Sequence, residues 1–421
     1  MNYNKIVQGI LDIGEAMLQS GAENFRLEDS FYRMCRSYGF KRSDVFVIPS
    51  NIQVTVETPE GEIITQIRHI ESSEPNFDQL DYLNNLCRYV CQHTPDENEM
   101  REKYLEVINR EPQKRITRYA AGIMGGTGFA VFFGCNLRDA VIAFIVSVMI
   151  VAVGDWLAKR ESNLLVYNGI LAFISEVIII GALKMGIAEH PDRIMIGIVM
   201  LLISGLSTTN GIRDLLQRDF ISGFINIMNS FLGAAGIAFG IGLAIILFHE
   251  GYSDHFILNH SVPIQLLSCT VACTGFALWF KIRGKQVWYN SIGAFFTWAI
   301  YVAVYAVKPS NFMATMIAAG FVGFYAFIMS RVNKAPSTIF LTASVFPLIP
   351  GPNLYYVMYG CVSQDPQLAF DETIVLMATC LAIAFGFIIV DVASRSIMHA
   401  MKREYHIGKS ALNLPLIGGK K

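Results

Sequence analysis

Residues 138–157 read RDAVIAFIVSVMIVAVGDWL, and residues 165–183 read LVYNGILAFISEVIIIGAL. Each of these apolar stretches is close to the roughly 20 residues that a helix needs to cross a hydrocarbon core of about 30 Å. Similar stretches recur along the chain, near 119–134, 193–210, 221–248, 263–280, 287–307, 312–330, 337–355 and 373–393. The sequence therefore predicts a polytopic α-helical membrane protein with about ten transmembrane helices.

Charged residues are distributed unevenly along the chain. The whole chain is 53% hydrophobic and 16% charged, whereas soluble domains are about one quarter charged. Residues 1–118 hold 33 of the 67 charged residues, and the remaining 303 residues hold only 34. This shift predicts a water-soluble N-terminal domain, residues 1–115, followed by a membrane part. The net charge of −1 argues against nucleic acid as a partner.

The first 115 residues carry the patterns of both helices and strands. Apolar residues recur with a helical period in four segments, 5–20, Asn24–Tyr38, Asn76–Cys91 and Asp96–Arg110. The period changes to two in three shorter segments, Val45–Ile48, Ile52–Glu57 and Ile63–Ile67. We therefore expect an N-terminal α+β domain.

Two local features restrict what this domain does. Asp12 and Glu15 interrupt the first apolar pattern, which predicts no secretory signal peptide and a domain that stays in the cytoplasm. No phosphate-binding loop is expected, because the nearest match, ending at Gly408-Lys409-Ser410, has Arg403 where the first glycine is required. ATP coupling within the chain is therefore not expected.

Two further groups of residues are interpreted as structural. The cluster of Arg26, Glu28, Asp29 and Arg33 fits a solvated helix face with i,i+3 and i,i+4 pairs, a ligand site being the alternative. The eight cysteines lack the spacing of a zinc site, and we expect them to be buried, reduced thiols.

Lysine and arginine residues predict the topology. With the N-terminus inside, the cytoplasmic segments of a ten-span arrangement hold 18 Lys and Arg residues, and the outer loops hold four. This bias is what the positive-inside rule predicts. An odd number of spans would place the basic C-terminal cluster outside. Ten spans with both termini in the cytoplasm are therefore expected.

Two segments 146 residues apart resemble each other. Leu202-Ile203-Ser204-Gly205 lies in the fourth predicted span and Leu348-Ile349-Pro350-Gly351 in the ninth. A repeat of five spans enters the membrane in the opposite sense in its second copy, because five is odd. Inverted repeats of this kind are typical of secondary transporters. The predicted divisions of the membrane part are repeat one, 116–260, repeat two, 261–400, and a basic cytoplasmic tail, 401–421.

Both matching segments contain residues that interrupt helices. Unwound backbone persists in a bilayer only where protein or a water-filled cavity satisfies it, and matched interruptions in two repeats point to a substrate site. The alternative is that both segments end at the membrane surface as loops. The residues expected at this site are Ser207, Thr208, Thr209 and Asn210, then Arg213 and Asp214 at its mouth, and Pro350, Gly351 and Asn353 in the second repeat.

Few ionisable residues lie within the predicted spans. Glu176 lies near the middle of the third span. A buried carboxylate costs at least about 2–3 kcal/mol, so it usually faces a cavity or a partner. We expect Glu176 to bind a coupling proton or cation, a structural hydrogen bond being the alternative. Asp155 is a further candidate, although exposure to water or a pair with Lys159 is the favoured interpretation, and Asp391 is expected to pair with Arg395.

Three motifs resemble those of the bacterial threonine/serine exporter family. They are Gly14–Glu23 followed by Arg26, Glu28 and Asp29; Val45–Val47 followed by Pro49; and Asn210–Leu216 followed by Ser222-Gly223. The family is similar in layout, with a cytoplasmic domain and ten spans on one chain or on two five-span proteins. The resemblance implies efflux of threonine and serine, driven by the proton-motive force, across a bacterial inner membrane. In one departure, Ser204-Gly205 stands where Pro-Gly is expected.

The expected function is proton-coupled export of threonine or serine through the lipid bilayer, with no cofactor, metal or nucleic acid. Glu176 would bind the substrate ammonium group, and the backbone of Ser207–Asn210 its carboxylate. A dicarboxylate exporter, of the succinate type, and a membrane sensor are the alternatives; the former needs a cationic site, for which only Arg213 is available. An enzyme is not expected, because Ala152-Val153-Gly154-Asp155 lacks the first glycine of an intramembrane aspartyl protease. A homo-oligomer is compatible with the sequence.

Overall fold

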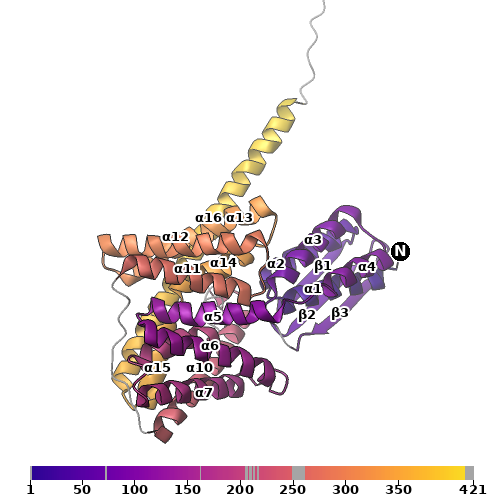
Figure 1. Cartoon of the computed structure of the whole chain (residues 1–421). Coiled ribbons are helices and arrows are strands. Elements are labelled where there is room, and N and C mark those ends of the chain that lie inside the picture. The colour runs from indigo at the N-terminus through magenta and orange to yellow at the C-terminus, as the bar shows by residue number, and fades with distance from the viewer. Residues whose placement is uncertain are drawn as a thin grey trace, which may run out of the picture.

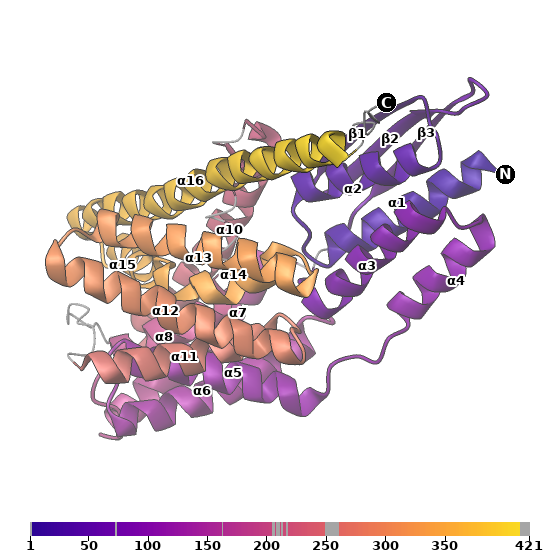
Figure 2. The ribbon, with the colours of Figure 1, turned by 90° about the horizontal axis from the view of Figure 1, so that it is seen from above.

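The computed structural model of the chain describes residues 2–71, 74–161, 163–203, 207, 211, 214, 215, 218–248 and 261–412. The N-terminal unit, residues 2–113, packs against one end of a bundle of long helices (Figure 1). Seen from above, the bundle helices run away from this unit, and α16 lies along one side of them (Figure 2). We call the end of the bundle that carries the N-terminal unit the near end and the opposite end the far end.

The described part of the N-terminal unit contains helices and strands where the sequence periods predict them. Its helices are α1 (Tyr3–Gln19), α2 (Asn24–Ser37), α3 (Phe77–His93) and α4 (Glu97–Ile108). Its strands are β1 (Arg42–Ile48), β2 (Asn51–Glu57) and β3 (Ile63–His69). They form an antiparallel sheet in the order β1-β2-β3, in which Val54 pairs with Val45 and with Gln66.

One apolar face of each element forms the core of this unit. The alternate residues Ile52, Val54 and Val56 of β2 are fully buried, because successive side chains of a strand point to opposite faces. Ile6 and Ile10 of α1 are buried at the helical spacing of four residues. All eight cysteines of the chain are free thiols; six are buried, one is half-buried (Cys91) and one is exposed (Cys361).

Seven helices among the described residues are long and apolar enough to cross a membrane. They are α6 (Leu137–Leu157), α7 (Leu164–Lys184), α10 (Phe220–Phe248), α11 (Val262–Trp279), α12 (Lys285–Val307), α13 (Asn311–Asn333) and the part Pro366–Ser394 of α16. The chain is thus a polytopic helical membrane protein. Helix α16 as a whole runs from Pro366 to Leu412, well into the segment predicted as a tail.

The other three predicted spans contain shorter or broken helices. The first predicted span is α5 (Arg115–Phe132), and the fourth is helical as α8 (Pro191–Leu202). The ninth is divided into α14 (Ser337–Val345), the 3₁₀ turn η1 (Phe346–Leu348) and α15 (Gly351–Val362). Pro347 and Pro350 explain this division, because proline lacks the N–H that continues a helix.

The outer surface of the bundle is apolar. On α10, Phe224, Phe231 and Phe239 are 61%, 65% and 65% exposed. Their spacing of seven and eight residues places them on one face of the helix. Such a face is costly in water and favourable in lipid, so we interpret it as a surface that contacts the bilayer.

Small residues allow the closest helix contacts. A Cβ added to Gly240 of α10 would lie 2.2 Å from the carbonyl oxygen of Gly169 on α7. A Cβ added to Gly386 of α16 would lie 2.7 Å from the carbonyl oxygen of Met316 on α13. Close approach of backbones at small residues is the usual packing mode of membrane helices.

Candidate substrate site

The two interrupted spans meet inside the bundle. Helix α8 starts at the far end and is described as far as Leu202–Ile203, while α14 and η1 start at the near end and stop at Leu348. A Cβ added to Gly351, the first residue of α15, would lie 2.2 Å from the Sδ atom of Met200 on α8. The absence of a side chain at Gly351 leaves room for this thioether, so Gly351 brings the second interruption against the first broken span. Pro350, beside it, is also buried.

Two buried carboxylates lie on α7 and α8. Glu176 of α7 has no exposed surface, and Asp192 in the first turn of α8 is 2% exposed. Both charges act on the phenol of Tyr355, which lies one turn beyond Gly351 in α15 and is 1% exposed. The cluster therefore combines acids from the first half of the membrane part with a tyrosine from the second.

Neighbouring rings hold Tyr355 in place. Its ring stacks on that of Tyr359 with the centroids 6.2 Å apart, and it meets the ring of Tyr356 nearly edge-on at 5.3 Å. Aromatic pairs in such arrangements contribute about 0.5–1.5 kcal/mol each beyond the burial of their area. These ring contacts restrict the rotation of the Tyr355 side chain.

Asn168 satisfies the backbone where α8 breaks off. It is 3% exposed on α7, and its Nδ2 donates to the carbonyl oxygens of Leu202 at 3.4 Å and of Gly233 at 3.2 Å. A carbonyl group at the end of a helix lacks an intrahelical donor, and this costs several kcal/mol in a bilayer unless a side chain supplies one. Asn168 is therefore part of the support of the first interruption.

The structure describes some of the residues predicted for the first interruption. Ser207 is helical and half-buried. Asp214 is half-buried and accepts a hydrogen bond from Nδ2 of Asn226 at 3.2 Å. The remaining members of the predicted set, Thr208, Thr209, Asn210 and Arg213, lie outside the described residues.

Two predicted residues have other partners in the structure. The Nδ2 of Asn353 donates to Oε2 of Glu372 on α16 at 2.8 Å, so this side chain joins α15 to α16. Asp155 pairs with Arg118 on α5, with 2.8 Å between its Oδ1 and the arginine Nη2, instead of with Lys159. The predicted partner was wrong because α5 folds back beside α6, a contact between helices that local spacing does not contain. The expected pair of Asp391 and Arg395 involves a side chain outside the described part.

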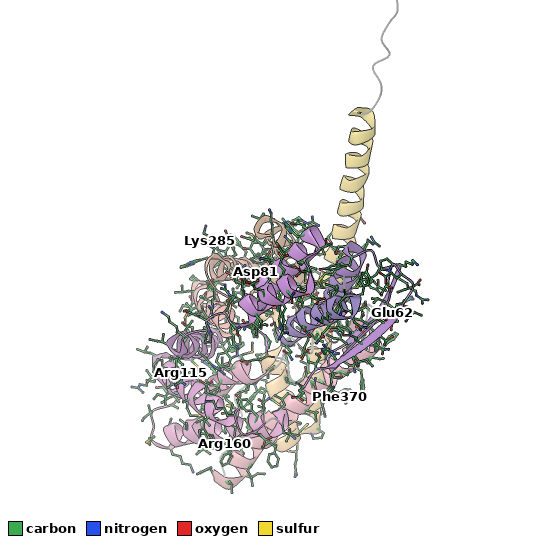
Figure 3. The ribbon with its side chains drawn as sticks, turned by 90° about the vertical axis from the view of Figure 1, so that its right-hand side faces the viewer. Glu62, Asp81, Arg115, Arg160, Lys285 and Phe370 are labelled. Atoms are coloured by element: carbon green, nitrogen blue, oxygen red, sulfur yellow. The ribbon has the colours of Figure 1, made fainter. Side chains whose placement is uncertain are left out.

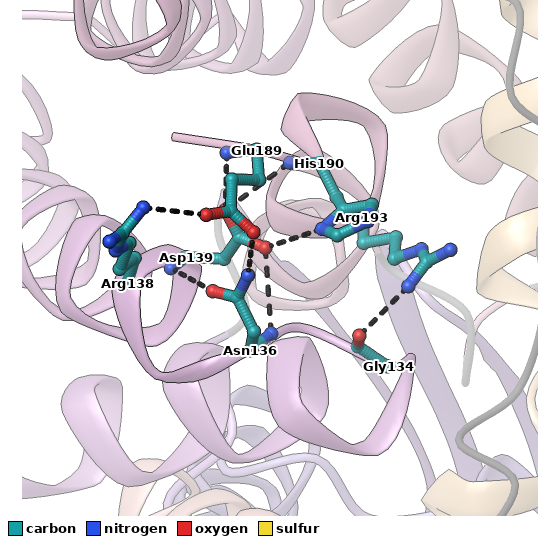
Figure 4. Close-up of polar contacts among 7 residues, drawn as sticks. All are labelled: Gly134, Asn136, Arg138, Asp139, Glu189, His190 and Arg193. Atoms are coloured by element: carbon teal, nitrogen blue, oxygen red, sulfur yellow. Dashed lines mark hydrogen bonds and ion pairs between the residues drawn. The ribbon is translucent and has the colours of Figure 1, made fainter. Parts of the chain in front are cut away.

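A separate polar network closes the far end of α6 and α8 (Figure 4). The buried Asp139 carboxylate accepts hydrogen bonds from the backbone N–H groups of Glu189 at 2.8 Å and His190 at 3.2 Å, and lies 2.9 Å from Nδ1 of His190. Asn136 and Asp139 also form a capping box at the start of α6. Arg193 donates to the carbonyl oxygen of Gly134 at 3.0 Å. This network fixes the entrance of α8 relative to α6.

Sequence reasoning found Glu176 and missed the residues that surround it. Asp192 stands at the edge of the fourth predicted span, and Tyr355 comes from a helix that the sequence does not place next to α7. A signal was available for Asn168, since an amide inside an apolar run is itself costly. No group of three or more His, Cys, Asp or Glu side chains that could hold a metal ion gathers in the described part of the chain.

Comparisons with known proteins agree with this architecture. A family model described as a threonine/serine exporter matches residues 8–248, and a second model, described as "Threonine/Serine exporter, ThrE", matches residues 265–393. The "Threonine/serine exporter" of Corynebacterium glutamicum is 23% identical over 394 residues, which cover 90% of this chain and 80% of the relative. The "Probable threonine/serine exporter" of Mycobacterium tuberculosis is 21% identical over 409 residues, 92% of this chain and 76% of the relative.

No solved structure matches the chain. The first family model alone covers more than half of the sequence, and it includes the N-terminal unit, Glu176 and α8. On this evidence the chain belongs to the threonine/serine exporter family.

Proposed function

We propose that this chain exports threonine and serine by exposing one site alternately to the two sides of the membrane. The observation that carries this proposal is the contact of Gly351 with Met200, where two interrupted spans meet in a bundle that also buries Glu176 on α7 and Asp192 on α8. Interrupted spans that meet near the middle of a bundle are where secondary transporters bind their substrates. The family and the printed names of both relatives supply the substrate class.

Ten spans arranged as two inverted five-helix repeats are the architecture that we propose. Helix α10 starts at Phe220 and α16 at Pro366, which are 146 residues apart. The same offset relates α8, Pro191–Leu202, to the combined span of α14 and η1, Ser337–Leu348. Gly240 and Gly386, the glycines of the closest helix contacts, are also 146 residues apart. The two family models meet between α10 and α11, where the repeats would be joined.

The orientation of the repeats follows from the direction of their helices. Helix α5 starts at the near end, beside the N-terminal unit, whereas α11 starts at the far end. Inverted repeats require such opposite directions. The excess of Lys and Arg in the near-end segments supports a cytoplasmic near end. Both termini would then lie in the cytoplasm of a bacterium, with the far end outside.

The chemistry of the site suits a small hydroxy amino acid. The carboxylates of Glu176 and Asp192 provide negative charge for the substrate ammonium group, and the start of α15 at Gly351 provides a positive helix end for its carboxylate. The Tyr355 phenol is placed to bind the hydroxyl group of threonine or serine. Glu176 remains our candidate for the coupling proton, because a buried carboxylate that changes charge responds directly to the proton gradient.

A dicarboxylate substrate fits this site less well. The buried charged side chains in the described part of the chain are Asp139, Glu176 and Asp192, and none is a Lys or Arg. Two substrate carboxylates would therefore meet negative groups without a compensating cation, which costs several kcal/mol in a low dielectric. Arg213, the predicted exception, lies outside the described residues.

Exchange transport tests the substrate class without any assumption about coupling. Purified protein in liposomes loaded with unlabelled threonine should take up labelled threonine, and external serine should compete. Succinate should not compete, and 2-aminobutyrate, which lacks the hydroxyl group, should compete more weakly than threonine. Uptake that succinate blocks and serine does not would contradict the amino-acid assignment.

A further inference from the structure

The N-terminal unit is fixed mainly to the second half of the membrane part, although it precedes the first half in the chain. Lys281 Nζ lies 3.0 Å from Oε1 of Glu74, and Nε2 of Gln286 donates to Oδ2 of Asp81 at 3.0 Å. The Phe77 N–H donates to the carbonyl oxygen of Phe280 at 3.1 Å. Figure 3 looks onto this side and places Asp81 next to the end of α12 that carries Lys285.

Apolar contacts reinforce this attachment. The rings of Phe77 and Phe280 lie 5.7 Å apart. Ile282 and, on α14, Ile339 and Phe340 belong to the same buried cluster as the core of the N-terminal unit. Burial of apolar side chains contributes about 1.5–3 kcal/mol each, so the unit and the near ends of α11, α12 and α14 form one body.

Between described residues, one hydrogen bond joins the N-terminal unit to the first half, and it comes from the start of α2. The Nδ2 of Asn24 donates to Oγ of Ser222 on α10 at 2.8 Å. All other hydrogen bonds and ion pairs between a described residue of the N-terminal unit and a described residue of the membrane helices go to residues 278–338. Asn24 is thus the hydrogen-bonded link to the first half within the described part.

The same helix turn also reaches the second half. Arg26 hydrogen-bonds to Oγ of Ser337, and Oγ1 of Thr338 donates to Oε1 of Glu23 at 3.0 Å. Ser337 and Thr338 start α14, the second broken span, while Ser222 lies just after the segment that leaves the first one. Residues 23–28 therefore bridge α10 of the first half and α14, the start of the second broken span. The predicted solvated face is confirmed only farther along α2, where the exposed Arg33 pairs with Asp29 at 2.6 Å.

We propose that residues 23–28, the α2 clamp, close the cytoplasmic side of the transport path by joining the two repeats, and that the bond between Asn24 and Ser222 must break whenever the site opens inward. This inference rests on the proposed transport by two repeats. It adds a moving contact that belongs to the N-terminal unit. The N-terminal unit moves together with the second repeat, and the α2 clamp is its reversible contact with the first repeat.

The strengths of the contacts fit this division. A neutral hydrogen bond such as that of Asn24 stabilises by about 0.5–1.5 kcal/mol, a contribution that thermal motion overcomes readily. The pKa of Glu28 is raised, chiefly because its carboxylate is partly buried. The charge of Asp219, just before α10, also raises this pKa, whereas the hydrogen bond from the N–H of Val47 at 3.3 Å lowers it. Glu28 and Asp219 are both acidic, so their ionised forms weaken the clamp. Among the described residues, the attachment to the second repeat combines ion pairs, hydrogen bonds and apolar burial, whereas the hydrogen-bonded contact with the first repeat is that of Asn24.

Two matched cysteine pairs test the proposal in the full chain. The clamp pair is Asn24→Cys with Ser222→Cys, and the control pair is Glu74→Cys with Lys281→Cys, both with Cys91 and Cys361 replaced by serine. In liposomes, each pair is cross-linked with a short bifunctional thiol reagent, and a reductant cleaves the cross-link afterwards. Bridging the clamp pair should slow threonine exchange about tenfold or more, because a required conformational step is blocked. Cross-linking the control pair should change the rate of threonine exchange less than about twofold, because Glu74 and Lys281 move together.

Two results would overturn the proposal. Undiminished exchange through the bridged clamp pair would mean that the contact is static, and equal inhibition by the control bridge would mean that the unit does not travel with the second repeat. Recovery after reduction excludes misfolding as the cause of inhibition. Spin labels on the same pairs give a readout without substrate: two distances are expected for residues 24 and 222 and one for residues 74 and 281. Failure of the protein without cross-links to transport threonine would contradict the proposed substrate. The spin-label distances would still test whether the α2 clamp opens.

Discussion

At the scale of single residues, the buried carboxylates of this chain have two kinds of surroundings. Asp139 accepts three backbone N–H groups and lies against the ring of His190, an arrangement that holds a fixed negative charge. Glu176 lies on α7 and Asp192 in the first turn of α8, and the charges of both act on the Tyr355 phenol of α15. We interpret Asp139 as structural, and the other two as groups that meet substrate and protons.

Replacement of Asp139 by Asn should therefore destabilise the fold. The amide keeps the shape of the carboxylate but loses its charge, and hydrogen bonds to charged groups contribute about 1.5–3 kcal/mol. We expect the free energy of unfolding to fall by about that amount in a denaturant titration in detergent micelles. The control is Arg138→Gln, which removes an exposed ion pair with Glu189 of 2.7 Å and should cost less than about 1 kcal/mol. Equal losses for the two variants would contradict this account.

Individual site residues were predictable to different extents. Glu176 could be found from the sequence, because a carboxylate in an uninterrupted apolar run is conspicuous. Asp192 could not, since it stands at the edge of the fourth predicted span, where a charge ordinarily reaches water. Tyr355 could not either, because its role depends on a contact between segments far apart in the chain.

At the scale of helices, hydropathy predicted the long membrane spans well and the broken ones poorly. It measures how apolar a segment is, and that property alone fixes where α6, α7 and α10 cross. The breaks depend on partners. The carbonyl of Leu202 is tolerated because Asn168 donates to it, and α15 starts where Gly351 meets Met200. No local pattern contains either partner.

The glycine contacts of α10 and α16 should be equally sensitive to added volume. Gly240→Ala would place a Cβ 2.2 Å from the Gly169 carbonyl oxygen, and Gly386→Ala one 2.7 Å from that of Met316. Backbone atoms cannot move aside cheaply, so each change should destabilise by about 1–3 kcal/mol. The control is Gly181→Ala on α7, where nothing lies within 4 Å. Thermal unfolding in detergent should separate the first two variants from the third; a loss confined to the control would contradict the packing.

At the scale of the whole molecule, the sequence predicted two parts with different solvents but not how they are joined. The charge distribution separates residues 1–118 from the rest. Chain order suggests that the N-terminal unit belongs to the first repeat, whereas its contacts attach it to α11, α12 and α14. This attachment depends on which side chains meet in the folded protein, and amino-acid composition does not contain that information.

The proposed orientation can be checked with a natural thiol. Cys361 is exposed near the far end of α15, whereas Cys91 is half-buried in the N-terminal unit and the other six cysteines are buried. A membrane-impermeant maleimide applied to intact cells should therefore label the wild type at one position. Labelling should be lost in Cys361→Ser and retained in Cys91→Ser. Labelling of Cys361 only after the cells are lysed would mean that the far end faces the cytoplasm.

The central claim is that the chain couples threonine export to protons through Glu176. The measurement that tests it most directly compares threonine accumulation driven by a pH gradient with threonine exchange lacking a gradient, in the same liposomes, for wild type and Glu176→Gln. An acid of this kind must gain and lose a proton in each coupled cycle, and glutamine cannot do so.

We predict that wild type accumulates threonine against its concentration gradient, and that Glu176→Gln loses this accumulation about tenfold or more while retaining exchange. Asp139→Asn, at the buried carboxylate that we assign to structure, should retain accumulation wherever the protein is folded. Gradient-driven accumulation that is unchanged in Glu176→Gln would contradict the assignment of this residue, and a wild type that moves no threonine in either assay would contradict the function itself.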